Sequence, residues 1–368
     1  MRLISRSVQS HHWLQTSFQR VFPLRLKLLS LFCLSLFSVT CGQMAMPGRA
    51  VAQDAPPSVI ASIKPVHSLV SAVMGNVGEV RLLVAGSASL HNHALKPSDV
   101  RAVAGADLLF WVGPGLESFL AKPLSANPPG QAVALIEADG LTLLEAREGG
   151  VWDSHDHDHA GHNHGHSNSH DHKHDHDDDH HHGEAGDHGD ADDHDDVNSH
   201  VWLDPQNARI WVAAIADALA KVDPSRAAIY QANASETDRK LEALDVELKA
   251  RLAPVASQPF VVFHDAYPYL EKRYGLNAAG SVTVDPDRRP SAKRVAALRA
   301  RISSLAGFCV FAEPQFEPAL VDTLIEGSKA RKGVLDPEGA GFEPGPDLYP
   351  AMMRAMAVSL TECLGNGG

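Results

Sequence analysis

The sequence is poor in several features that would define its class at once. It has only four cysteines in 368 residues, so it is not a small disulfide-rich scaffold. No apolar run reaches the ~20 residues of a membrane-spanning helix, and the one that comes nearest, Leu28 to Val39, has twelve. Neither a G-x-x-x-x-G-K-[ST] phosphate loop nor an H-E-x-x-H zinc motif occurs. These absences argue against an integral membrane protein, a P-loop ATPase and a zinc protease of the H-E-x-x-H type.

Basic residues are fewer than acidic ones, 32 against 45, which gives a formal net charge of −13. One segment accounts for all of this charge, because residues 153–196 contain fifteen acidic residues and a single lysine. The remainder of the chain is nearly neutral. Its charge therefore gives no reason to expect a nucleic-acid partner, and no RNA- or DNA-binding motif is present.

The same segment, 153–196, holds fifteen of the 22 histidines and has no proline and no apolar residue larger than alanine. Such a composition cannot bury a core, so we expect a disordered loop. Imidazoles bind zinc, copper or nickel, although a flexible run does so weakly and without fixed geometry. It stays open whether this run is the main metal site or an accessory to one elsewhere. The expected weak ligands are His155, His157, His159, His162, His164, His166, His170, His172, His174, His176, His180, His181 and His182.

The amino end has the pattern of a secretory signal. Basic residues precede the apolar run, and Ala50-Val51-Ala52 has the small-x-small form of a cleavage site. We expect residues 1–52 to be removed and the mature chain to be soluble and exported. A lipid anchor on Cys41 is the alternative, but "SVTC" lacks the leucine usually found three residues before such a cysteine.

The mature chain keeps two cysteines, Cys309 and Cys363. Two cysteines in an oxidising compartment predict one disulfide, worth ~4 kcal/mol by the chain-entropy model. Two buried free thiols are the alternative.

Short apolar runs alternate with helical stretches from Pro57 onward, which predicts an α/β fold with parallel sheets covered by helices. Asp204 and Pro205 predict a helix start, and Ser98 an earlier one. Residues 224–252 contain no internal Pro or Gly, which predicts a ~43 Å rigid connector helix. We therefore expect two lobes, 57–222 and 254–368, joined by a connector at 223–253.

Polar side chains follow several predicted strands. His264 comes directly after "FVVF", Asp336 after "GVL" and Glu313 after "FCVFA", while His91 follows "EVRLLV" by a short loop and His200 precedes the helix capped by Asp204. Ligands gather beyond the carboxyl ends of parallel strands. Three imidazoles and a carboxylate would complete the four-coordinate site that zinc favours.

Plainer interpretations remain open at this point. A single histidine at a strand end is more often a hydrogen-bonded structural residue than a ligand, and we expect His67 to be one. Glu313 could bond only to backbone, or orient a neighbouring histidine. Composition and periodicity alone do not distinguish between a metal site and a set of structural histidines.

Several blocks of the sequence carry a family resemblance. "ASIKPVHSLVSAVM", "HNHALKPSDVRAVAGADLLFWVG", "HVWLDPQNA", "FVVFHDAYPYLEKRYGL", "CVFAEPQF" and "GVLDPEG" resemble the metal-binding lipoprotein and adhesin-like family of ABC-transporter substrate-binding proteins. Among its members the chain is most similar to those that take up zinc in the periplasm, which also carry an acidic histidine-rich loop at this place.

The resemblance implies a ligand set residue by residue. It puts ligands at His91, His200 and His264, and a fourth at Asp336 or a water molecule. The chain departs from the pattern at Leu90, where some zinc members have an acidic residue, and at His93, where an aromatic residue is usual; His93 could replace or assist His91. Related manganese carriers place a carboxylate where His264 stands, and three imidazoles favour zinc.

The function implied is a monomeric periplasmic zinc receptor that delivers zinc to an inner-membrane permease with a separate ATPase subunit. It is not expected to be an enzyme. The alternatives are a manganese or iron carrier of the same family, a secreted zinc hydrolase with Glu313 as acid-base group, and a metal store or sensor built on the histidine run.

Overall fold

The structure is a computed structural model, which describes residues 55–85, 90, 93–147, 197–283, 290–304, 308–316 and 319–365. The predicted signal segment 1–52, the predicted histidine-rich loop 153–196 and His91 lie outside the described residues.

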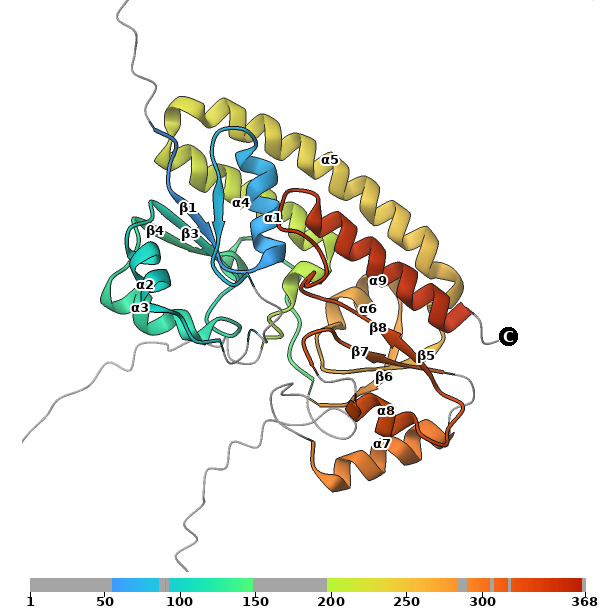
Figure 1. Cartoon of the computed structure of the whole chain (residues 1–368). Helices are drawn as coiled ribbons and strands as arrows, with labels where there is room; N and C mark the ends of the chain where they lie inside the picture. Colours follow the sequence, from blue (N-terminus) through green and yellow to red (C-terminus); the bar gives the residue numbers. More distant parts are fainter. Residues whose placement is uncertain are drawn as a thin grey trace, which may run out of the picture. The chain divides into compact units, whose positions relative to one another are not determined.

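The described residues form two parallel sheets of four strands each, which confirms the predicted α/β class (Figure 1). The first sheet has the order β2-β1-β3-β4 and the second the order β6-β5-β7-β8. The strands of the first sheet are β1 (Val59–Ala61), β2 (Val80–Leu82), β3 (Leu108–Trp111) and β4 (Gln131–Ala134), and those of the second are β5 (Pro259–Val262), β6 (Asn277–Ser281), β7 (Cys309–Ala312) and β8 (Arg331–Val334).

Helices connect the strands and cover the sheets. The first half contains α1 (Lys64–Met74), α2 (Pro97–Ala104), α3 (Ala121–Ala126), α4 (Pro205–Val222) and α5 (Ala227–Leu252); the second contains α6 (Pro268–Tyr274), α7 (Ala292–Ser304), α8 (Ala319–Ile325) and α9 (Leu348–Gly365). None of the helices in the described ranges is long and apolar enough to cross a membrane.

Successive strand residues face opposite sides of each sheet, and each side has its own core. In β3, Leu109 and Trp111 pack with residues of α2 and the turn before α3, while Leu108 and Phe110 face the other way. That second side belongs to a core that continues through α1, α4, α5 and α9 to β5 and β7 of the second sheet. The two lobes therefore share one hydrophobic core.

The predicted connector helix is present, and its carboxyl end falls at Leu252 as expected. Its first predicted turn, Pro224–Arg226, is a separate 3-10 helix, so α5 has 26 residues rather than 29. It contacts α1, α4 and α9, and Figure 1 shows it running beside α9. The proposed lobe boundaries at 222 and 254 remain a prediction.

Helix starts follow the local signals with one difference. The Asp204 carboxylate accepts a hydrogen bond from the Gln206 amide and caps α4, as predicted. Helix α2 instead begins at Pro97, with Lys96 at the N-cap, because proline already has the backbone angle of the first helical position. Ser98 lies within its first turn.

The predicted disulfide between Cys309 and Cys363 is confirmed. It joins the start of β7 to the last turns of α9 and so attaches the carboxyl-terminal helix to the second sheet.

Candidate metal centre

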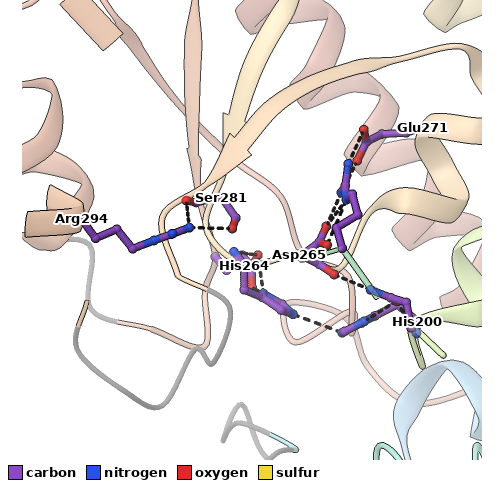
Figure 2. A network of polar contacts seen from close by, with 9 residues as sticks. His200, His264, Asp265, Glu271, Ser281 and Arg294 are labelled. Atoms are coloured by element: carbon purple, nitrogen blue, oxygen red, sulfur yellow. Dashed lines mark hydrogen bonds and ion pairs between the residues drawn. The ribbon is translucent and has the colours of Figure 1, made fainter. Parts of the chain in front are cut away.

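Two histidines from different parts of the chain meet in the interior. His264 follows β5 at the carboxyl edge of the second sheet, and His200 immediately precedes the 3-10 turn that leads into α4. They are 3% and 7% exposed, respectively. Their Nε2 atoms lie 3.1 Å apart. Figure 2 marks this contact with a dashed line.

The partners of the other ring nitrogens assign the tautomer of each imidazole. The Asn198 amide nitrogen donates to the Asp265 carbonyl at 2.7 Å, so its Oδ1 is free to accept from His200 Nδ1 at 3.1 Å. His264 Nδ1 donates to Glu313 Oε1 at 2.8 Å, and Glu313 Oε2 lies 2.7 Å from the same nitrogen without forming a hydrogen bond. With both Nδ1 atoms protonated, two Nε2 lone pairs point at the same place, and a bound cation satisfies both.

Glu313 is a buried carboxylate behind this pair, only 3% exposed. Besides His264 it accepts a hydrogen bond from the Tyr267 hydroxyl at 3.1 Å. Burial, followed by the charge of Glu313, raises the pKa of Tyr267 well above its usual range, so Tyr267 stays a donor. The carboxylate thus adds negative charge next to a position that suits a cation.

Asp336 lies two residues after β8 and is half-buried. Its carboxylate accepts hydrogen bonds from the Gln315 amide at 3.0 Å and the Gly341 backbone at 3.1 Å. Within the described ranges, no three His, Cys, Asp or Glu side chains lie close enough to hold a metal together. The structure joins His200 to His264 and His264 to Glu313 by pairwise contacts, while the printed partners of Asp336 are Gln315 and Gly341.

His93 is half-buried and packs edge-on against Phe119, with ring centroids 5.0 Å apart. Burial lowers its pKa, which favours the neutral ring that metals bind. His67, expected to be structural, bonds through Nε2 to the Val80 carbonyl at 3.0 Å.

Sequence reasoning did not single out Asn198 and Tyr267, which bond to His200 and Glu313, or Arg147, which bonds to Asp265 next to His264. Asn198 stands two positions before His200, so its closeness to a candidate ligand was a usable signal. Arg147 had none, because its partners Asp265 and Glu271 are more than one hundred residues away in the sequence.

The chain also matches a known family over almost all of its described length. The model of the family "Zinc-uptake complex component A periplasmic", abbreviated ZnuA, matches residues 59–363. The chain belongs to this family.

ZnuA relatives match most of the chain. The High-affinity zinc uptake system protein ZnuA of Brucella abortus (strain 2308) is 54% identical over 307 residues, which are 83% of this chain and 91% of the relative. Its counterpart in Paracoccus denitrificans is 40% identical over 332 residues, 90% and 97% of the two chains. The solved "Crystal structure of ZnuA" superimposes with a TM-score of 0.62 at 21% identity, covering 84% of this chain and 99% of that one, and supports the shared two-lobe fold.

Proposed function

We propose that this protein is the high-affinity zinc receptor of an ABC importer, which binds one Zn²⁺ between its lobes and delivers it to a membrane permease with a separate ATPase. The observation that carries this proposal is the buried His200–His264 pair, whose two Nε2 atoms lie 3.1 Å apart. Membership of the ZnuA family supports zinc as the cargo.

The proposed ligands are His91, His200 and His264, with Asp336 or a water molecule in the fourth position and His93 as a substitute or aid for His91. Imidazole ligands suit zinc, whereas manganese prefers carboxylate and water oxygens. Two imidazoles already stand where the ion would sit, and this favours zinc over the manganese or iron alternative.

The proposed role is transport and not catalysis. A zinc hydrolase needs an acid-base group beside the metal-bound water. Glu313 was the candidate, but its carboxylate is buried and already accepts hydrogen bonds from His264 and Tyr267. These contacts leave it suited to orienting His264.

Export, oligomeric state and the histidine run complete the proposal. The family is periplasmic by its description, which supports export of this protein. A signal cut after Ala52 and a monomeric mature protein are further parts of the proposal. The segment 153–196 is proposed to collect or buffer zinc weakly, while the site formed by His91, His200 and His264 holds one ion tightly. Its carboxyl end lies four residues before His200.

The test compares three forms of the mature protein: wild type, a deletion of 153–196 and His264→Ala. Native mass spectrometry counts the ions, and chelator competition with zinc, manganese and copper measures affinity. The deletion is expected to lose the weakly held ions and keep one tight zinc, and His264→Ala to keep the weak ions and lose most of the tight affinity.

Two outcomes would contradict the proposal. If the deletion abolishes tight binding, the histidine run is itself the site. If wild type binds manganese in preference to zinc, the cargo assignment is wrong.

A further inference from the structure

Arg147 occupies a position that the proposed function does not explain. It is the last described residue before 148–196, and its side chain is only 25% exposed. Its guanidinium reaches two carboxylates of the second lobe, those of Asp265 and Glu271. Figure 2 shows these two residues near His200 and His264. These carboxylates are 8% and 11% exposed.

All three guanidinium nitrogens donate to this carboxylate pair. Nε donates to both oxygens of Asp265 at 3.0 Å, and Nη2 contacts Asp265 as well. Nη1 and Nη2 donate to the two oxygens of Glu271 at 3.0 and 2.8 Å. Although burial lowers the pKa of Arg147, these hydrogen bonds raise it overall, so the group stays charged.

The carboxylate pair is linked through Asp265 to both imidazoles of the candidate site. Asp265 follows His264 directly, and its backbone carbonyl accepts from Asn198, whose Oδ1 accepts from both the backbone and the ring of His200. Arg147 therefore holds the turn that carries His264 against the segment that carries His200.

Neighbouring contacts attach the strand end before Arg147 to the segment that carries His200, and that segment to the second lobe. Glu145 forms an antiparallel bridge with Val197, and the Asn198 amide donates to the Leu144 carbonyl at 2.8 Å. The Tyr269 hydroxyl donates to the Asn198 carbonyl at 2.7 Å. These contacts fix the backbone around Arg147, so a change in its side-chain contacts is expected to shift Asp265 and the adjacent His264.

We propose that Arg147 is a positioning residue for the metal site: by bridging Asp265 and Glu271 it sets the separation of His200 and His264, and so the affinity for zinc. This inference rests on the proposed zinc receptor function. Groups bonded directly to metal ligands typically change metal affinity 10- to 100-fold when removed. Because Arg147 acts through Asp265 and Asn198, we expect an effect at the low end of this range.

Loss of the Arg147 guanidinium would change zinc affinity in opposite directions through its charge and through its effect on the position of His264. Removing a positive charge near a cation site raises the affinity for Zn²⁺ if only the electrostatic field matters. Releasing two buried, mutually repelling carboxylates moves the His264 turn and lowers affinity if position matters. The direction of the change therefore separates the two.

The chain offers a matched control in Arg209. Its side chain is also 25% exposed, and it forms a two-point pair with Asp238 at 2.6 and 3.0 Å. This pair lies between α4 and α5 and makes no contact with either candidate ligand in the described structure. Loss of Arg209 removes a similar ion pair without touching the frame around His200 and His264.

The experiment measures zinc affinity by chelator competition, and the absorption spectrum of bound Co²⁺ as a reporter of coordination geometry, in R147M, R147K and R209M. R147M is expected to bind one zinc about tenfold more weakly and to shift the Co²⁺ spectrum. R147K keeps the charge but not the fork, so a several-fold loss is expected. R209M is expected to match wild type in both measurements.

Wild-type or tighter zinc affinity in R147M overturns the inference, and so does wild-type affinity in R147K, whether or not R147M folds. An equal loss in R209M also overturns it, because the effect would then be a general one on stability. All of these leave the proposed function standing as long as wild type binds zinc tightly and His264→Ala does not.

Discussion

Among single residues, Glu117 combines full burial with a carboxyl group outside the candidate metal site. It accepts hydrogen bonds from the Ser62 hydroxyl at 2.5 Å and from the backbone amides of Val112 and Gly113 at 3.2 and 2.9 Å. It thereby ties the end of β1 to the end of β3. Burial raises its pKa to about 7 in spite of these bonds.

We predict that Glu117 makes the stability of the protein fall as pH rises from about 4.5 to about 7. A carboxyl whose pKa is higher in the folded state binds its proton more tightly there, so its stabilising effect is complete below the unfolded pKa and is lost through the folded one. The effect is at most about 3 kcal/mol. Urea unfolding of metal-free wild type and Glu117→Gln from pH 4.5 to 8 measures it. Parallel stability curves for the two proteins would rule the effect out.

The elements of the second lobe depend on a covalent link between β7 and α9. The Cys309–Cys363 bond spans 54 residues of sequence. We predict that reduction lowers the free energy of unfolding by about 4 kcal/mol in the chain-entropy model. Unfolding with and without reductant measures this loss, and the variant C309S/C363S serves as control because reductant should not affect it. Alkylatable cysteines in natively exported protein would contradict the prediction.

The molecule as a whole is held together by more than the connector helix. Its two sheets share one core, and Lys64 of α1 reaches into the loop after β8. The ammonium is buried and donates to the carbonyls of Gly339, Ala340 and Phe342 at 3.2, 3.0 and 2.9 Å. The Trp202 indole also donates to the Pro337 carbonyl at 2.8 Å, in the same loop. The residue next to Pro337 is Asp336, the proposed fourth ligand.

We predict that Lys64→Met destabilises the protein by about 1–3 kcal/mol, because it keeps the aliphatic stem but removes the ammonium donor. The Gly339 carbonyl still accepts from the Phe342 backbone amide, whereas those of Ala340 and Phe342 lose the bond to Lys64. Chemical unfolding measures the change. The control is Lys332→Met, which removes a surface pair with Asp322 (N–O distance 2.6 Å) and should cost less than about 1 kcal/mol. Equal losses of unfolding free energy in the two variants would show that the contact of Lys64 with the loop after β8 stabilises the protein no more than a surface ion pair does.

Much of the local architecture could be predicted from neighbouring residues. The cap at Asp204, most strands and the end of α5 at Leu252 depend on propensities that act within a few positions. Strand β6 has no such signal, because "NAAGS" contains no β-branched or aromatic residue. Its pairing with β5 makes it a strand. Helix α2 starts at Pro97, one residue before the predicted Ser98, because proline favours the first helical position.

The sequence by itself determined the fold class, the disulfide pair and the motifs that place His200 and His264 at the ends of their elements. Only the tertiary structure decided what those histidines face. The contact of their Nε2 atoms joins residues 64 apart, Arg147 meets Asp265 across 118, and Lys64 reaches Gly339 across 275. Periodicity and capping act over one or two turns of chain, whereas these contacts depend on how two sheets pack around a common core.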